Sequence, residues 1–229
     1  MTLKAIISYD DTPNDRDALM FGRFLAEAGA DLTLAYVRHA RHEDPGRELD
    51  EAHAADALLE HGADWLGDDE IERRVIVNAS TAEGLKELAE EEAADIVVFG
   101  SDYRTAAGHV APQHTAQGLL EGGPAAVAIA PAEYRSDGTP SVARIGVLAA
   151  PGDDSAIDTA RELADAFDAK VTRDERYVDL LVVGSRTEAP EGRVVITANA
   201  QNEIENATCP VLVIPRGVTL RFPAQLAVS

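Results

Sequence analysis

Short apolar runs alternate along the chain with segments whose apolar residues recur at helical spacing. The runs Lys4–Tyr9, Leu32–Val37 and Arg73–Val77 predict buried strands. Between the first two runs, a helical stripe is formed by Ala18, Phe21, Leu25 and Ala28. A strand, a helix and a second strand in this order predict a right-handed parallel crossover, and therefore an α/β protein.

Capping residues predict where the helices begin and end. Three pairs at a spacing of three residues predict N-terminal caps, and they are Asn14 with Asp17, Ser80 with Glu83, and Ser155 with Asp158. A long helix follows the second strand, with a stripe formed by Leu49, Ala52, Leu59 and Leu66, and Gly67 closes it.

The stretch Asp95–Pro131 recurs without insertion or deletion as Asp179–Pro215, 84 positions later. The residues kept in both copies include a strand-ending Gly-Ser, a glycine in the following loop and a proline after the last strand. Each copy predicts a strand, a polar loop, a helix and a second strand. Open α/β sheets place ligands beyond the carboxyl ends of their strands, so the loop that follows Gly-Ser is a candidate binding site.

The repeat divides the chain into a complete unit, residues 1–133, and a reduced unit, residues 142–218. Turn residues dominate between them, where we place the boundary. The second unit has strands at Ala143–Leu148, Lys170–Thr172 and Val178–Val183 but lacks the long helix, third strand and capped helix of the first. In the C-terminal tail, residues 219–229, we expect an edge strand at Val218–Phe222 followed by a loose segment.

The charge composition disfavours some classes of binding partner. The 229 residues carry a formal net charge of -21, from 41 acidic and 20 basic residues, which disfavours binding to nucleic acid or an anionic membrane. The acidity fits either a salt-rich cytoplasm or an arginine-rich genome. No apolar run approaches membrane-spanning length and no signal peptide is evident, so we expect a cytoplasmic protein.

Two candidate reactive features have simpler interpretations. Cys209 is the one cysteine, so an internal disulfide is impossible, and its place at the start of an apolar strand favours a buried thiol over a nucleophile. His39 and His42 lie beside Glu43 and Asp44, which would permit a weak metal site, but solvated loop residues are the favoured interpretation.

With its repeat, its two Gly-Ser loops and Asp10 after the first strand, the chain resembles the universal stress protein family in tandem form. The resemblance implies two Rossmann-like, adenine nucleotide alpha hydrolase-like parallel sheets, the first in strand order 3-2-1-4-5 and the second smaller. In that family dimers pair through the fifth strand. The equivalent strands here, Ala126–Ala130 and Val211–Ile214, should therefore form an intramolecular pseudo-dimer, and a homodimer is also conceivable.

The resemblance also implies an ATP site in the first unit. Asp10 matches an adenosine-contacting residue, Val37 the residue whose backbone meets adenine, and Gly100 the first glycine of a G-x2-G-x9-G-[ST] loop. Tyr103, Gln113 and His114 depart from that loop pattern. The predicted binding residues are Asp10, Val37, Gly100, Ser101, Arg104, Gly108, His114 and Thr115.

The leading hypothesis is a stress-response regulatory protein that binds ATP or another anion in the first unit alone. The second unit should bind no nucleotide, because Ala149 or Ala150 stands where Asp10 would be. One alternative is a ligand-free pseudo-dimer that acts through an unknown protein partner. Another is a nucleotide-hydrolysing α/β enzyme, although the loop lacks a Walker-type lysine and a nucleophile elbow, so at most slow ATP hydrolysis is expected.

Overall fold

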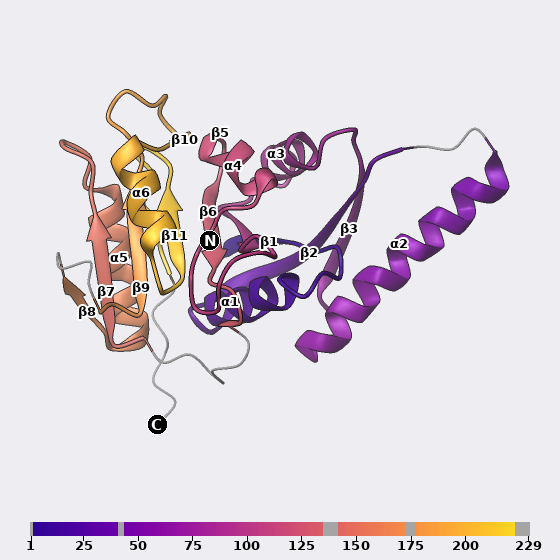
Figure 1. Cartoon of the computed structure of the whole chain (residues 1–229), viewed down its shortest axis with the longest axis horizontal. Coiled ribbons are helices and arrows are strands. Elements are labelled where there is room, and N and C mark those ends of the chain that lie inside the picture. Colours follow the sequence, from indigo (N-terminus) through magenta and orange to yellow (C-terminus); the bar gives the residue numbers. More distant parts are fainter. Residues whose placement is uncertain (1, 41–43, 135–141, 173–176, 223–229) are drawn as a thin grey trace.

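One continuous nine-stranded sheet runs through the whole molecule in the order β3-β2-β1-β4-β6-β11-β9-β7-β8 (Figure 1). This computed structural model describes residues 2–40, 44–134, 142–172 and 177–222. The strands of the sheet are β1 (Leu3–Ser8), β2 (Ala30–Arg38), β3 (Glu72–Val77), β4 (Ile96–Gly100), β6 (Ala126–Ala130), β7 (Arg144–Leu148), β8 (Lys170–Thr172), β9 (Leu180–Gly184) and β11 (Val211–Ile214). The helices are α1 (Asp15–Glu27), α2 (Pro45–Leu66), α3 (Thr81–Glu91), α4 (His114–Leu120), α5 (Ser155–Phe167) and α6 (Ala198–Asn206).

The first half of the sheet, residues 1–133, has the predicted topology. Its strands are all parallel in the order β3-β2-β1-β4-β6, which is the order 3-2-1-4-5 once the short β5 is set aside. The second half continues as β11-β9-β7-β8, again parallel and one strand smaller. The strand order follows from short crossover connections, each of which carries a helix back across the sheet.

The two halves meet where β6 and β11 pair in antiparallel fashion, with Val127 opposite Val213 and Ala128 opposite Leu212. Every residue of both strands is buried. Strands buried on both faces read as uninterrupted apolar runs, which is how both strands were recognised in the sequence. Instead of two separate sheets packed together, the chain forms a single sheet with one reversal of strand direction.

Helices cover both faces of the sheet, and the core beneath each face contains residues of both halves. On one face α1, α2 and α5 bury their apolar sides, and on the other α3, α4 and α6 do so. Phe24 of α1 stacks on Phe167 of α5 with ring centroids 4.3 Å apart and an interplanar angle of 13°. The apolar cores are therefore shared between the halves rather than divided at the β6–β11 junction.

A second, two-stranded sheet was not foreseen. β5 (Glu121–Gly123) and β10 (Val194–Val195) pair in antiparallel fashion, one from each half. Glu121-Gly122-Gly123 has no β-branched or aromatic residue, so no propensity marked it as a strand. The pairing arises because α4 and α6 end and begin near the junction and bring these segments together.

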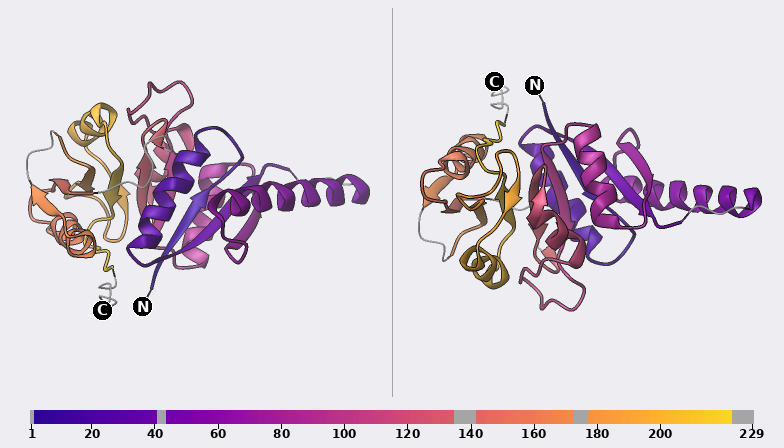
Figure 2. Two further views of the ribbon diagram at one scale, coloured as in Figure 1. Left: turned by 90° about the horizontal axis from the view of Figure 1, so that it is seen from below. Right: turned by 90° about the horizontal axis from the view of Figure 1, so that it is seen from above.

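Helix α2 projects from the rest of the molecule (Figures 1 and 2). Gly67 closes it in the left-handed conformation, as predicted, with φ of 69°. Its buried residues lie in the second half, from Ala55 to Ala63, and Leu49 in the first turns is 56% exposed. Leu49 belongs to the predicted helical stripe with Leu59, but it does not reach the core.

Of the three predicted caps, only that of Ser80 forms as a side-chain cap, with its Oγ accepting from the Glu83 amide at 3.3 Å. Asn14 makes no capping bond, because its amide donates to the Ser101 carbonyl instead. At α5, Ser155 is already helical and donates through its hydroxyl to Asp153 at 2.6 Å. The prediction failed where another part of the chain competed for the capping side chain.

The expected edge strand at Val218–Phe222 does not form. Leu220 is 1% exposed and Phe222 is also buried in the cluster that contains α5. The Leu220 amide donates to the buried Thr159 hydroxyl of α5 at 3.0 Å. Residues 219–222 are therefore packed rather than loose, because the side chains of Leu220 and Phe222 are buried in the cluster that contains α5. Residues 223–229 lie outside the described part of the chain.

Candidate functional site

The candidate site lies where β1 ends between its neighbours β2 and β4. In the sheet, β2 lies on one side of β1 and β4 on the other. The end of β1 is therefore the topological switch point of the first half. β1 leads into the turn Tyr9–Asn14, and Asp10 in this turn is exposed. The predicted nucleotide residue Asp10 is thus open to solvent at the position where such folds bind ligands.

A buried carboxylate builds this turn. Asp15 Oδ2 accepts from the Asp10 amide at 3.0 Å, from the Thr12 amide at 2.9 Å and from the Thr12 hydroxyl at 2.8 Å. Burial, followed by the hydrogen bond with the Asp10 side chain, raises the pKa of Asp15 to about 8. Asp15 therefore keeps its proton to a higher pH than an ordinary aspartate does.

The same turn is tied to α2. The Tyr9 hydroxyl donates to Asp11 Oδ1 at 2.9 Å, and His61 Nδ1 of α2 lies 3.1 Å from Asp11 Oδ2. The hydrogen bond from Tyr9 is the largest cause that lowers the pKa of Asp11, whereas burial raises the pKa of Tyr9. Asp11 has φ of 61°, so the turn holds a non-glycine residue in the left-handed region.

Val37, the predicted adenine-contacting residue, lies one residue before the end of β2, with its side chain against α3. A methyl group added at Gly84 of α3 would lie 3.1 Å from Val37 Cγ1, so the two elements are close-packed. The next residue, Arg38, is buried and forms an ion pair with Glu48 of α2. Arg38 Nε has no hydrogen-bond partner among the described residues.

Gly100 is required by packing. A Cβ at this position would lie 2.0 Å from the Asn14 carbonyl oxygen, so only glycine lets the start of α1 reach the end of β4. Asn14 also donates its side-chain amide to the Ser101 carbonyl. The first glycine of the loop is therefore explained by the contact between α1 and β4, without a phosphate.

Ser101 is buried, and its hydroxyl is already engaged. It donates to the Ala130 carbonyl at 2.7 Å and accepts from the Ala111 amide at 3.2 Å. The second copy repeats this arrangement, where Ser185 donates to Ile214 at 2.7 Å and accepts from Val195 at 3.3 Å. The serine thus pins the loop to the last strand in both halves and is not available to a ligand.

Gly108 serves the turn of the loop. It has φ of 76°, and its amide donates to the Ala132 carbonyl at 2.8 Å. Its counterpart Gly192 has φ of 72° and donates to Arg216 at 2.9 Å. Glycine is favoured at both positions because they adopt the left-handed conformation.

The cationic groups of the loop are only partly free. Arg104 Nε donates to the Tyr103 hydroxyl at 2.7 Å, and its guanidinium carbon lies 4.9 Å from the centre of that ring. His114 begins α4 and is exposed, and Thr115 is half-buried beside it. Asn14 contacts Gly100 and Ser101, whereas Asp10 is held by Asp15, and no hydrogen bond or ion pair among the described residues joins Arg104 or His114 to Asp10.

The corresponding crevice of the second half is a hollow of about 350 Å³ beyond β7 and β9. Small residues replace the carboxylates here, and the lining includes Ala149, Ala150 and Gly184. Thr187 closes one side by donating to the Pro151 carbonyl at 3.2 Å. Where the first half has Asp102 and Arg104, the second half has Arg186 and Glu188, so the two opposite charges exchange positions.

Sequence reasoning missed Asp15 and His61. Asp15 belongs to the acidic turn that begins at Asp10, and its burial at 4% exposure could not be read from composition. Asp44, part of the weak metal cluster weighed above, instead caps α2 by accepting from the Gly46 amide at 2.8 Å. His42 and Glu43 lie outside the described residues, and the described residues contain no cluster of three metal-binding side chains.

Membrane insertion finds no support in the helices. Among residues 2–40, 44–134, 142–172 and 177–222, none of the helices has the length and the apolar character that crossing a bilayer requires.

The sequence model of the universal stress protein family matches residues 1–131. The chain belongs to the universal stress protein family. The match covers β1 to β6 with the switch point at Asp10, so the family is assigned on the half that carries the candidate site. No curated protein sequence matches the chain.

Several solved universal stress proteins are similar to this member of the family. One from Archaeoglobus fulgidus DSM 4304 has a TM-score of 0.62 at 14% identity, over 93% of this chain and 98% of that one. A putative universal stress protein from Pseudomonas aeruginosa UCBPP-PA14 has a TM-score of 0.58 at 12% identity, over 93% of each chain. A universal stress protein in complex with cAMP has a TM-score of 0.35 at 24% identity, over 43% of this chain and 72% of that one.

At these identities the likeness of the first two structures concerns the fold alone. It extends over both halves, because more than nine tenths of this chain is covered in each case. The universal stress protein fold therefore accounts for the arrangement of the strands and helices, and the chemistry must be argued from the side chains.

Proposed function

We propose that this universal stress protein is a regulatory stress-response protein that binds an adenine nucleotide in its first half and holds the nucleoside part more firmly than the phosphates. The observation that carries the proposal is the position of Asp10. Its carboxyl group is exposed at the switch point between β2 and β4, on a turn that Asp15 fixes with three hydrogen bonds. A fixed carboxylate is a good acceptor for the vicinal hydroxyls of a ribose.

Weak retention of the phosphates follows from the loop. Gly100 is packed against Asn14 and the Ser101 hydroxyl is engaged, so neither can serve a phosphate without rearrangement. Arg104 is held by Tyr103 of the same loop. Asp10, Asp11 and Asp102 add negative charge nearby, which opposes a triphosphate. We therefore expect affinity to fall from adenosine monophosphate to ATP.

Rapid chemistry is not part of the proposal. Burial raises the pKa of Cys209 to about 12, so this thiol is not an activated nucleophile. The loop from Asp102 to Gln113 contains no lysine, which phosphoryl transfer commonly uses. We expect at most slow hydrolysis of bound ATP.

Calorimetric titration of the purified chain with adenosine, AMP and ATP tests the proposal, with Asp10→Ala as the decisive variant. Asp154→Ala is a matched control, because Asp154 is an exposed carboxylate before α5 that makes no capping bond. We expect binding to be lost in Asp10→Ala and kept in Asp154→Ala. Equal loss, or equal retention, in both variants would contradict a site at Asp10.

A second candidate function is favoured by the loop geometry, namely a ligand-free intramolecular pseudo-dimer that acts through a protein partner. Both copies of the loop make the same internal hydrogen bonds through Ser101 and Ser185, as an architectural element would. Absence of any heat of binding with adenosine, AMP and ATP at millimolar concentration would favour this function over the first.

A further inference from the structure

The sheet has two open edges of unequal length. β3, with six residues, forms one end, and β8, with three residues, forms the other. The edge that universal stress proteins would offer through their fifth strand is used inside this chain, where β6 pairs with β11. β3 is therefore the longer strand with a free side.

The backbone groups on that free side can be identified. The Asn78 amide donates to the Arg38 carbonyl at 3.0 Å, so Asn78 and, two residues apart along the strand, Ile76 and Arg74 face β2. The alternate residues Val75 and Val77 then direct their N–H and C=O groups away from the sheet. A row of such groups is a template for pairing with another strand.

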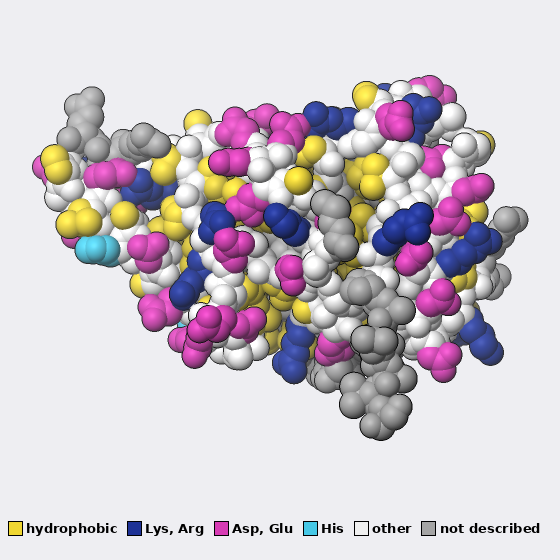
Figure 3. All heavy atoms as spheres, turned by 180° about the vertical axis from the view of Figure 1, so that it is seen from behind, with side chains coloured by type: hydrophobic (Ala, Val, Ile, Leu, Met, Phe, Trp, Pro, Cys, Tyr) yellow, Lys and Arg dark blue, Asp and Glu magenta, His cyan; other side chains and the backbone are white. Residues whose placement is uncertain are grey.

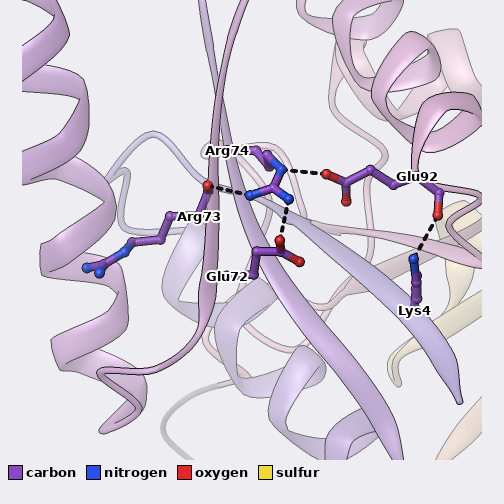
Figure 4. A network of polar contacts seen from close by, with 5 residues as sticks. All are labelled: Lys4, Glu72, Arg73, Arg74 and Glu92. Carbon is purple, nitrogen blue, oxygen red and sulfur yellow. Dashed lines mark hydrogen bonds and ion pairs between the residues drawn. The ribbon is translucent and has the colours of Figure 1, made fainter.

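Side chains on the α3 face hold this edge in place (Figure 4). Arg74 Nε donates to Glu92 at the end of α3 at 2.6 Å, and the same guanidinium pairs with Glu72. Its Nη1 donates to the Arg73 carbonyl at 3.2 Å, while Lys4 donates to the Glu92 carbonyl at 3.1 Å. The Arg73 carbonyl on the free side is therefore already bonded within the edge, so the outward groups left for another strand are those of Val75 and Val77.

On the opposite face, β3 and α2 form a groove of about 380 Å³. It is lined by Asp56, Leu59, Glu60, Arg73 and Val75. Val75 is 36% exposed, and Figure 4 shows the Arg73 side chain directed toward α2. None of the ion pairs among the described residues involves Arg73, Asp56 or Glu60, so the groove contains unpaired charges of both signs.

We propose that β3 adds to β3 of a second copy of this chain in antiparallel fashion, about a two-fold axis at Val75. This register pairs the outward N–H and C=O of Val75 with those of the partner's Val75, and it brings Arg73 opposite the partner's Val77. Arg73 then approaches the acidic residues of the partner's α2. The result is an isologous interface in which one sheet continues through both molecules.

A second copy is favoured over an unrelated strand because the patch is complementary to itself. Arg73 supplies the positive charge and Asp56 and Glu60 the negative charge within one groove, and a two-fold axis matches each sign to its opposite. On the face that Figure 3 shows, acidic side chains are spread widely with basic ones interspersed among them. A net charge of -21 per chain opposes association of two copies at any surface, so the matched charges of this groove must offset that repulsion.

Sedimentation equilibrium of the whole chain at about physiological salt tests the proposal through Val75→Pro. Because the Val75 amide faces outward, proline removes an intermolecular donor without removing a bond to β2. Val171→Pro on β8 is the matched control, because the neighbouring Lys170 amide donates to Ala143 at 2.9 Å and the Val171 amide faces outward at the other edge. We expect a dimer for the unmodified chain and Val171→Pro, and at least about tenfold weaker association for Val75→Pro.

Charge exchange gives an independent readout on folded protein. Arg73→Glu alone and the double variant Asp56→Lys with Glu60→Lys should each sediment as monomers, because each brings like charges together. Mixed in equal amounts, the two should form a heterodimer, since opposite charges are restored on both sides of the axis. Circular dichroism of each variant establishes that it is folded.

Three results would overturn the proposal. They are a monomer at all concentrations of the unmodified chain, a dimer that folded Val75→Pro leaves unchanged, and a mixture of the charge variants that stays monomeric. An unrelated strand as the natural occupant of β3 would give the first of these results. None of these measurements involves nucleotide, so failure here is distinct from failure of the site at Asp10.

Discussion

The two copies of the Gly-Ser loop, residues 101–113 and 185–197, have the same backbone hydrogen bonds and different side chains. In each copy the serine hydroxyl donates to the last strand at 2.7 Å, and the middle glycine donates back to the segment after that strand at 2.8 or 2.9 Å. At the mouth, Asp102 and Tyr103 of the first copy become Arg186 and Thr187 in the second.

The hydrogen bonds shared by the two loops are set by the fold, since the second loop retains them although it lacks the candidate ligand residues of the first. Gly100 shows how far the copies diverge in packing, because the Asn14 carbonyl lies where its Cβ would be, whereas the nearest atom to a Cβ at Gly184 is 3.2 Å away. The loop is therefore an architectural element first, and the ligand site that we propose depends on the Asp10 turn of the first half.

The largest difference between the copies should come from alanine at the strand-ending glycine. Gly100→Ala places a methyl group 2.0 Å from the Asn14 carbonyl, so α1 must shift, and we expect a loss of about 3 kcal/mol in the free energy of unfolding. Gly184→Ala meets its nearest atom at 3.2 Å and should cost about 1 kcal/mol. Urea unfolding of both variants measures this, and equal losses would remove the distinction.

The dependence of stability on pH should also separate the halves. The folded pKa of Asp15 lies above its unfolded value, so the folded state binds more protons and stability falls as pH rises from about 4 to about 8. Asp15→Asn should abolish this fall. The slope of the unfolding free energy against pH, measured by urea titration, would remain unchanged if Asp15 were not the cause.

Asp153 of the second half should show the opposite behaviour. Burial alone would raise its pKa, but hydrogen bonds from Ser155 and Gly217 outweigh burial and lower it. Its contribution is present above the unfolded pKa of about 4 and is lost as pH falls through the folded value. Asp153→Asn should therefore reduce the loss of stability on acidification, and an unaltered acid limb of the titration would speak against this.

Alanine in place of the loop serine should affect both copies alike. Ser101→Ala and Ser185→Ala each remove a donor at 2.7 Å and leave the amide of Ala111 or Val195 without its acceptor. We expect a loss of about 1–2 kcal/mol for each variant in thermal or urea unfolding. Values that differ by more than about 1 kcal/mol would show that the shared hydrogen bonds are not energetically equivalent.

The smallest effect concerns the caps of α4 and α6. Thr197 Oγ1 accepts from the Ala200 amide at 3.1 Å, whereas Gln113 at the same position of the first copy makes no side-chain cap. Thr197→Ala should cost about 1 kcal/mol, and Gln113→Thr should gain up to about that amount. Denaturant midpoints report both changes, and no gain from Gln113→Thr would mean that the α4 backbone cannot accept the cap.

Much of the fold was predictable because the strands of a parallel sheet are buried on both faces. Runs such as Ile96–Phe99 and Val211–Ile214 have no polar interruption, and the repeat itself indicated that the second half lacks a strand. Helix caps were less predictable. The Asn14 side chain donates a hydrogen bond to Ser101, and the Ser155 hydroxyl donates one to Asp153, so neither caps its helix. The spacing of two residues in the sequence does not show whether another group will bind the capping side chain.

The candidate site was predicted in position more than in chemistry. Asp10 lies at the switch point as expected, but the roles of Gly100 and Ser101 are packing roles, which only their partners Asn14 and Ala130 reveal. The buried carboxyl of Asp15 left no pattern, since a charged residue in a polar turn reads as solvated. β5 formed without strand propensity, because pairing partners rather than its own residues determined it.

The antiparallel junction of β6 and β11 also changes how the second half depends on concentration. Between separate chains, such a pairing is a bimolecular equilibrium that dilution reverses, whereas within one chain it is intramolecular. Residues 142–172 and 177–222 contribute four strands to the main sheet, the short β10 and two helices, which is little structure for a core of its own. Covalent linkage to the first half keeps their buried strand covered at any protein concentration, so the reduced half could lose a strand and two helices and remain folded.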